Sequence, residues 1–354
     1  MKVLHVLNTS TFSGAENVAC QIIKMYEKTD ISMAYCSRDG SVRKQLEDLR
    51  IDYYPIAEMS CRELDRVIAE YKPDIIHAHD MRATYYSCKN HSRVPVICHI
   101  HNNAYDSRRI SKKSVAFLIA SLRIRHIFWV SDEALSDYAF YRMVRKKSTV
   151  LLNIIDWDSI NEKISKDNNT YSFDIVFLGR LSDEKAPLRF IEIVDDVRKS
   201  YPELKVAVIG DGQLRDDVQR MVSSKNLLDV VTLFGYMNNP LKVLKDSKCL
   251  VLTSKREGLP MCAIESQMVG TPIICTPVGA LPKIVESDRT GYLCNSNSEF
   301  VSSILSVICD KDNCQRLSDN SIEFAKRYND KQVFMDKLSG QYRMIAKSNE
   351  KGDR

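Results

Sequence analysis

Two carboxylates separated by seven residues, Glu257 and Glu265, are the side chains whose spacing suggests chemistry most directly. The stretch that they bound reads E-G-L-P-M-C-A-I-E, and it follows an apolar run, Cys249 to Thr253, that is typical of a buried strand. A strand, a tight turn and a helix start leave unpaired backbone N–H groups pointing outward. Carboxylates at such a turn can accept hydrogen bonds from neutral hydroxyls, and sugars, including ribose, have many hydroxyl groups.

The helix predicted from Met261 to Val269 would position both glutamates. Pro260 suits its first position, where the N–H that a proline lacks would be unpaired anyway, and Gly258 lets the backbone approach a ligand closely. Glu257 then lies at the helix start and Glu265 about one and a half turns inside. The alternative is an ordinary helix, whose dipole favours a glutamate at its start, with the second glutamate on a solvated face.

Arg180 and Lys185 lie in a loop that follows another predicted strand, Phe173 to Leu178. Ligands of parallel sheets bind at the carboxyl ends of the strands, so one ligand could contact both cations and both Glu257 and Glu265. The planar fork of an arginine and the compact charge of a lysine suit a diphosphate. Taken alone, the two cations could equally be ordinary surface residues of a solvated loop.

The N-terminal half opens with a short apolar strand, Val3 to Leu7, a polar loop and a helix, as a doubly wound α/β domain does. Gly14 in this loop could let a phosphate or an acceptor approach the backbone. Ser13 and Glu16 have the spacing of a helix capping box, so Glu16 is explained either by capping or by a ligand. The full G-x-G-x-x-G pattern is absent.

Histidines end two further predicted strands of this half, as His77 and His79 in one and His99 and His101 in the other. Polar residues at the ligand edge of a parallel sheet favour a functional role for His101. His99 and His101 share a face of their strand. The spacing therefore leaves open which of these two reaches the ligand.

Apolar runs alternate with segments of helical periodicity along both halves of the 354 residues, which predicts βαβ units and parallel sheets. A polar linker from Ser165 to Thr170 separates the halves. We therefore predict two Rossmann-like, doubly wound α/β domains, residues 1–165 and 166–330, each long enough for its own core. A helical tail, residues 331–354, is expected to pack back on the N-terminal domain.

The composition, with 44% hydrophobic and 27% charged residues, is that of an ordinary globular protein. No segment has the length of a membrane span or of a signal-peptide core, so we expect a cytoplasmic protein. The eleven cysteines include no C-x-x-C pair, which argues against a disulfide framework or a zinc site. No D-x-D motif is placed to hold a divalent ion, and we expect no metal and no cofactor.

One basic segment, Arg108 to Arg125, has six basic residues, no acidic residue and an apolar centre. Between Arg82 and Val150 there are 13 Lys and Arg residues against four Asp and Glu residues, although the net charge of the chain is only +5. A basic, partly amphipathic helix of this type can lie on an anionic membrane surface. The alternative is a core helix with solvated ends. No nucleic acid is expected, because no binding motif accompanies the charge.

Several segments resemble the glycosyltransferases of group 1, family 4, which are retaining enzymes with the two-domain GT-B fold. In the second half these are F-L-G-R-L-S-D-E-K (Phe177 to Lys185), S-K-R-E-G-L-P-M-C-A-I-E (Ser254 to Glu265), G-T-P-I-I-C-T-P-V-G-A-L-P-K-I-V (Gly270 to Val285) and T-G-Y-L (Thr290 to Leu293). In the first half they are S-G-A-E (Ser13 to Glu16), D-I-I-H-A-H (Asp74 to His79) and L-N-I-I-D (Leu152 to Asp156). The resemblance covers nearly the whole chain and implies two domains that face a central cleft.

In the second domain, the resemblance implies that Arg180 and Lys185 hold the diphosphate of a donor and stabilise the leaving nucleotide. It implies that Glu257 contacts hydroxyls of the donor sugar, beside the backbone of Gly258 and Leu259. These residues would stabilise charge without a metal, because a preorganised cation or helix N-terminus can stabilise the negative charge of a departing diphosphate.

The resemblance also assigns residues outside this loop. Glu265 would bind the ribose, His101 would lie near the reacting sugar, and Gly14 would lie close to the donor phosphates and the acceptor. Ser13 occupies a position where many family members have a second glycine, so the resemblance supports the approach of a ligand to that loop less strongly.

Together these observations predict a retaining, metal-independent glycosyltransferase with His101, Arg180, Lys185 and Glu257 as catalytic residues. Its donor would be a nucleoside-diphosphate sugar, a UDP-hexose or UDP-N-acetylhexosamine, and its acceptor a hydroxyl of a lipid-linked saccharide in capsule, exopolysaccharide or O-antigen synthesis. The segment Arg108 to Arg125 would bind the inner face of the cytoplasmic membrane. The alternatives are a nucleotide-sugar epimerase of the same architecture and a non-catalytic nucleotide-sugar-binding protein.

Overall fold

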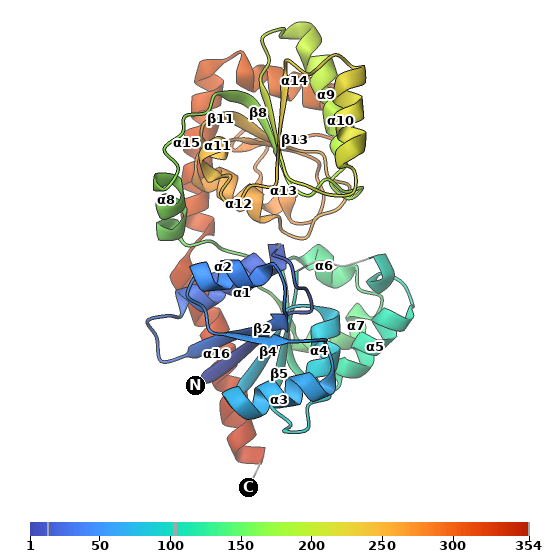
Figure 1. Cartoon of the computed structure of the whole chain (residues 1–354), viewed down its shortest axis with the longest axis vertical. Helices are drawn as coiled ribbons and strands as arrows, with labels where there is room; N and C mark the ends of the chain where they lie inside the picture. Colours follow the sequence, from blue (N-terminus) through green and yellow to red (C-terminus); the bar gives the residue numbers. More distant parts are fainter. Residues whose placement is uncertain (13, 102–104, 353–354) are drawn as a thin grey trace. The chain divides into compact units, whose positions relative to one another are not determined.

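The computed structural model describes residues 1–12, 14–101 and 105–352. The chain folds into two compact units, one formed by Met1–Ile154 with Lys331–Arg354 and the other by Ile155–Asp330. Each unit is a parallel β-sheet covered by helices (Figure 1). The prediction of two Rossmann-like α/β domains is therefore confirmed.

The sheet of the first unit has seven parallel strands in the order β3-β2-β1-β4-β5-β6-β7. Its strands are β1 (Lys2–Val6), β2 (Ser32–Arg38), β3 (Tyr53–Ile56), β4 (Ile75–Ala78), β5 (Val96–Ile100), β6 (Ile124–Trp129) and β7 (Ser148–Val150). Its helices are α1 (Gly14–Met25), α2 (Val42–Asp48), α3 (Cys61–Tyr71), α4 (Met81–Ser87), α5 (Lys112–Ser121), α6 (Asp132–Ser136), α7 (Tyr141–Val144) and α16 (Lys331–Gly352). The strand order reverses between β1 and β4, and such a switch point is where open α/β sheets bind ligands.

The sheet of the second unit has six parallel strands in the order β10-β9-β8-β11-β12-β13. Its strands are β8 (Phe173–Leu178), β9 (Val206–Ile209), β10 (Val231–Gly235), β11 (Ser247–Leu252), β12 (Ile273–Cys275) and β13 (Gly291–Leu293). Its helices are α8 (Trp157–Ser165), α9 (Pro187–Ser200), α10 (Arg215–Ser224), α11 (Leu241–Lys245), α12 (Met261–Met268), α13 (Leu281–Ile284), α14 (Asn297–Ile308) and α15 (Lys311–Tyr328). Here the switch point lies between β8 and β11.

The boundary between the units lies earlier than the sequence suggested. The predicted boundary places helix α8 in the N-terminal domain, but α8 packs against α11 and α12 of the second unit. Ile160 is its buried residue, and the amide of Asn239 donates a hydrogen bond of 2.6 Å to the carbonyl of Lys163. The polar segment after residue 165 is therefore a loop inside the second unit, and the chain changes unit at Ile154.

The C-terminal helix α16 packs against the first unit. The hydroxyl of Tyr26 donates to the carbonyl of Met335 at 2.8 Å and lies 2.7 Å from the hydroxyl of Ser339. One helical repeat further on, the hydroxyl of Tyr342 lies 2.6 Å from Nδ1 of His77 in β4. The tail therefore covers the face of the sheet on which His77 lies.

The basic segment is not one helix. Helix α5 covers only Lys112–Ser121, with Ser111 as a capping residue that accepts a hydrogen bond from the backbone of Ser114. Arg125 already lies in β6, which pairs with β5, so the predicted continuous helix from Arg108 to Arg125 is wrong. Among the residues that the structure describes, we find no helix with the length and apolar character needed to cross a bilayer.

Candidate active site

The loop between β8 and α9 carries Arg180 and Lys185 and has a fixed backbone conformation. Ala186 ends the loop in the left-handed region, at φ 48°, and Pro187 then begins α9. The amide of Lys185 donates to the carbonyl of Ser182 at 3.1 Å. This turn directs the loop back over the carboxyl end of β8.

The loop between β11 and α12 is tied to the first loop by hydrogen bonds. The amide of Lys255 donates to the carbonyl of Glu184 at 2.7 Å, and the hydroxyl of Thr253 donates to the carbonyl of Ala186 at 3.0 Å. An exposed ion pair of 2.6 Å between Lys255 and Asp183 adds to these contacts. Loops that follow neighbouring strands at the switch point thus form one assembly.

Lys185 and Glu257 meet where the two loops adjoin. The ammonium nitrogen of Lys185 lies 2.5 Å and 2.7 Å from the two carboxylate oxygens of Glu257, and the hydroxyl of Ser254 donates to the first of these oxygens at 2.6 Å. The side chain of Glu257 is only 6% exposed, whereas that of Lys185 is 23% exposed. The lysine therefore neutralises a buried carboxylate and still reaches solvent.

A third loop fixes the backbone beside Glu257. Gly279 has φ +57°, and a Cβ at this position would lie 2.2 Å from the carbonyl oxygen of Glu257. The amide of Ala280 donates to the carbonyl of Gly258 at 2.8 Å. Only a glycine permits this close approach, and the resulting contacts fix the turn that begins α12.

Helix α12 carries Glu265 into the same region. It begins at Met261, with Pro260 as the residue before its first turn rather than as its first residue, a difference of one position that is common at helix ends. Burial raises the pKa of the Glu265 carboxyl, and the nearby charge of Lys163 opposes this rise. Among the described residues, the Glu265 carboxylate makes no hydrogen bond or ion pair.

Cys262 lies close to the groups that the sequence singled out. Burial raises the pKa of its thiol to about 12, the charge of Lys185 opposes the rise, and those of Glu257 and Glu265 add to it. The charges of Lys185, Glu257 and Glu265 therefore all act on this one thiol. Arg180 lies on the same loop as Lys185, but its side chain is exposed and takes no part in this hydrogen-bonded network.

In the first unit, Gly14 begins helix α1. It is exposed, and a Cβ at this position would meet no described atom within 4 Å. Glu16 is buried and accepts a short hydrogen bond from the hydroxyl of Thr9. Ser13, the other half of the predicted capping box, lies outside the described residues.

His99 and His101 occupy different environments at the end of β5. His99 is fully buried within the strand, whereas His101 follows the strand and is only partly buried. Nε2 of His101 lies 2.9 Å from Nδ1 of His79, and burial lowers the pKa of His101 to about 3. His101 is therefore neutral, and it is the one of the pair nearer the surface.

The sequence did not reveal the uncharged residues that hold the loops of the site in place. Thr253 and Ser254 act through hydrogen bonds that only the folded loops create, and the left-handed conformation of Ala186 has no signal in an alanine. His5 in β1, which lies beside His79, gave no signal because it stands in an apolar strand.

Two family models match the chain. The model for glycosyl transferases of group 1 matches residues 158–324, which are almost all of the second unit, and the model for glycosyltransferase family 4 matches residues 12–159.

Two curated relatives have known activities. A galactosyltransferase from Escherichia coli, which uses UDP-Gal and α-D-GlcNAc-diphosphoundecaprenol, is 25% identical over 92% of this chain and 94% of its own length. A Campylobacter jejuni N-acetylgalactosaminyltransferase, which acts on a diphospho-undecaprenol-linked saccharide, is 28% identical over 44% of this chain and 43% of its own length.

Among solved structures, Anabaena HepE in complex with UDP-glucose superposes with a TM-score of 0.83 at 18% identity, over 99% of this chain and all of that one. The fold is GT-B, as predicted. Together the two family matches span residues 12–324, and the chain belongs to the group 1, family 4 glycosyltransferases.

Proposed function

We propose that this protein transfers a sugar from a UDP-sugar, with retention of anomeric configuration, to a hydroxyl of a lipid-linked saccharide in polysaccharide synthesis. The E. coli and C. jejuni relatives act on saccharides linked to diphosphoundecaprenol. The HepE structures contain UDP, UDP with glucose, or UDP-glucose. These likenesses support the choice of donor and acceptor, and the resemblance to retaining enzymes supports retention.

The contact between Lys185 and Glu257 carries the proposal. A cation and a carboxylate stand side by side at the β8/β11 switch point, 2.5 Å apart at their nearest atoms. A nucleotide sugar carries a binding group for each of these side chains. Its diphosphate can pair with the ammonium group of Lys185, and its sugar hydroxyls can donate hydrogen bonds to the carboxylate of Glu257. On binding, Lys185 would turn toward the phosphates and Glu257 would accept hydrogen bonds from the sugar.

Arg180 and the start of α12 would complete the phosphate site. Arg180 has an exposed guanidinium on the same loop as Lys185, so it is free to meet an anion from solvent. The backbone at Gly258 and Leu259 leads into α12, and a helix N-terminus favours negative charge. Loss of one preorganised group that stabilises developing charge costs roughly 10²- to 10³-fold in rate. These groups supply positive charge to the leaving diphosphate, so the proposed reaction needs no metal ion.

The remaining predicted residues keep their proposed roles. Glu265, a partly buried residue whose carboxylate has no hydrogen-bond partner among the described residues, would accept hydrogen bonds from the two ribose hydroxyls. His101 would contact the reacting sugar. The open backbone surface at Gly14 would face phosphate or acceptor.

Helix α5 would hold the protein on the membrane that carries its acceptor. Ser114 and Phe117 lie on its buried side, where Phe117 packs against Trp129 of β6, so Val115, Ile119 and Leu122 project on the opposite side. Ile119 and Leu122 are 59% and 81% exposed, and exposed apolar residues flanked by lysines are typical of helices that bind anionic lipid surfaces.

Incubation of the purified protein with radiolabelled nucleotide sugars and membrane lipid extract tests the proposal. If the protein transfers sugar, label from one UDP-sugar should appear in the lipid phase. If it retains the anomeric configuration, NMR of the product should show an α-linkage from an α-donor. Isomerised free donor would instead indicate an epimerase. Saturable binding without turnover would indicate a non-catalytic binding protein, and either result overturns the proposal.

A further inference from the structure

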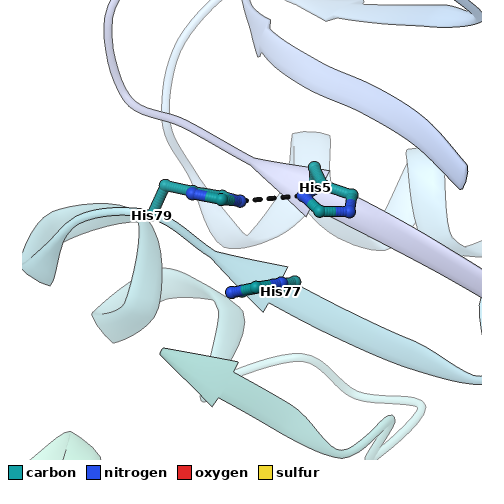
Figure 2. A group of neighbouring side chains, drawn as sticks. All are labelled: His5, His77 and His79. Carbon is teal, nitrogen blue, oxygen red and sulfur yellow. Dashed lines mark hydrogen bonds between the residues drawn. The ribbon is translucent and has the colours of Figure 1, made fainter. Parts of the chain in front are cut away.

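Five histidines lie together on one face of the first sheet, at the carboxyl ends of β1, β4 and β5. His5 pairs in register with His77, and alternate residues of a strand share a face, which adds His79, His99 and His101. Figure 2 shows His5, His77 and His79 at this point, with the hydrogen bond that joins His5 to His79. This cluster lies at the β1/β4 switch point.

All five imidazoles are held neutral. Burial lowers the pKa of His5 and His101 to about 3. Burial also lowers the pKa of His77, His79 and His99 well below the usual value, and charge on the neighbouring histidines adds to this effect. A neutral imidazole has one N–H donor and one acceptor nitrogen, so each hydrogen bond between two of these rings makes the tautomer of one ring depend on that of the other.

Three of the rings form a continuous hydrogen-bonded chain. Nδ1 of His5 lies 2.8 Å from Nε2 of His79, and Nδ1 of His79 lies 2.9 Å from Nε2 of His101. The planes of the His79 and His101 rings are nearly parallel, at 7°, and the ring centroids are 5.2 Å apart. Because nitrogens of the two rings lie only 2.9 Å apart, this centroid distance is that of rings meeting edge to edge, where the N–H and the lone pair of an imidazole point.

Met33 determines the direction of this chain. Its sulfur lies 3.3 Å from Nε2 of His5, and a thioether can only accept a hydrogen bond. His5 must therefore carry its proton on Nε2, and its Nδ1 accepts from Nε2 of His79. The bare Nδ1 of His79 then accepts from Nε2 of His101, so that His101 in turn has its proton on Nε2.

We propose that Met33, His5 and His79 are positioning residues that fix His101 as the Nε2–H tautomer and leave its Nδ1 as a hydrogen-bond acceptor. Nδ1 of His101 is buried and has no hydrogen-bond partner among the described residues, and a buried acceptor of this kind needs a donor. If the proposed sugar transfer is correct, a hydroxyl of the bound sugar is that donor. His101 then orients the sugar by accepting a hydrogen bond and is not a proton donor.

The same histidines could be considered as metal ligands, because nitrogens of His5, His77 and His79, and of His79, His99 and His101, lie close to one another. Both nitrogens of His79 are occupied by the hydrogen bonds to its neighbours. A metal bound by either group would have to break one of these bonds. The in-plane geometry of the chain favours the hydrogen-bonded arrangement.

Two-bond ¹H–¹⁵N correlation spectra of histidine-labelled protein test this inference, because they distinguish the two neutral tautomers. The wild-type protein is expected to show His5, His79 and His101 as Nε2–H tautomers near pH 7. Nδ1–H on His101, or a stoichiometric transition metal in the purified protein, would overturn the proposal. The spectra require no substrate, so a failed transfer assay would not affect their interpretation.

Met33→Leu removes the acceptor at the end of the chain while keeping the side-chain volume. The ratio of tautomers at His5 and His101 is expected to shift toward Nδ1–H by roughly 2- to 10-fold, as for the loss of one hydrogen bond. In an active enzyme kcat should fall with an unchanged melting temperature. Met59→Leu, at another buried methionine of the same unit, is the control. An unchanged tautomer ratio in Met33→Leu would refute the role of Met33.

Discussion

The ammonium group of Lys185 makes contact with both carboxylate oxygens of Glu257, at 2.5 Å and 2.7 Å, and the two residues come from loops after neighbouring strands. Because Glu257 is almost completely buried, Lys185 is the cation that makes this burial tolerable. The two charges therefore satisfy each other within the protein. A donor that takes up both partners would replace this pair without leaving either charge uncompensated.

The first prediction concerns the stability of this pair. Lys185→Ala should lower the free energy of unfolding by about 1–3 kcal/mol, because among the described residues it leaves the buried carboxylate with Ser254 alone as a hydrogen-bond donor. Adding Glu257→Gln should restore part of this loss, since an amide keeps the volume without the charge. Urea unfolding of the two variants measures the difference. If the double variant were less stable than Lys185→Ala, the pair would not act as described.

The second prediction contrasts two glycines. Gly14→Ala should leave the melting temperature unchanged or slightly raised, because the new methyl group meets no described atom and alanine favours a helix. It should raise the KM for the donor if a phosphate approaches this backbone. Gly279→Ala is the counterpart, because its methyl group would clash with the backbone of Glu257. Gly279→Ala should lower both the melting temperature and the activity. An unchanged KM in Gly14→Ala would contradict the role proposed for the first loop.

The third prediction concerns pH. Burial raises the pKa of Glu265 in the folded protein, so the folded state holds this proton more tightly than the unfolded chain does. The contribution of Glu265 to stability is therefore greatest below its usual pKa near 4.5. It decreases as the pH rises through the folded-state value.

Glu265→Gln removes this titration. At a pH above the folded-state pKa of Glu265, the variant should be more stable than the wild type, and it should bind UDP more weakly. Melting temperatures measured from pH 4 to pH 8, with and without UDP, provide the test. The explanation would be wrong if the two proteins had parallel pH profiles.

The fourth prediction concerns the membrane. Ile119→Ser with Leu122→Ser should reduce flotation with vesicles that contain phosphatidylglycerol, since both side chains are exposed, one on α5 and one directly after it. Lys112→Ser with Lys113→Ser should reduce it further, because each basic residue near an anionic surface contributes about 1 kcal/mol. Leu228→Ser, at an apolar residue of the second unit that is 71% exposed, is the matched control. Equal flotation of all variants would exclude α5 as the membrane-binding element.

The sequence predicted the fold because its apolar runs and helical segments alternate regularly in both halves. It misplaced the boundary because the polar stretch after Ser165 has the composition of a linker. Helix α8 buries Ile160 and is hydrogen-bonded to Asn239, and only the fold reveals these contacts with the second unit.

The charged residues of the candidate site could be predicted because Arg, Lys and Glu in strand-to-helix loops are uncommon enough to be noticed. Their supports could not be predicted in the same way. Gly279 approaches Glu257 across more than 20 positions of the chain, and His5 meets His79 only because β1 and β4 are neighbours in the sheet. Such relations depend on register, which no local pattern encodes.

Steady-state transfer rates of site variants test the central claim most directly. With the UDP-sugar and lipid-linked acceptor that support turnover, Lys185→Ala and Glu257→Ala should each lower kcat/KM by roughly 10²- to 10³-fold. Lys225→Ala, which breaks a comparable pair of 2.8 Å with Asp195 in the same unit, should retain wild-type activity. Undiminished transfer by the Lys185 and Glu257 variants would contradict the account.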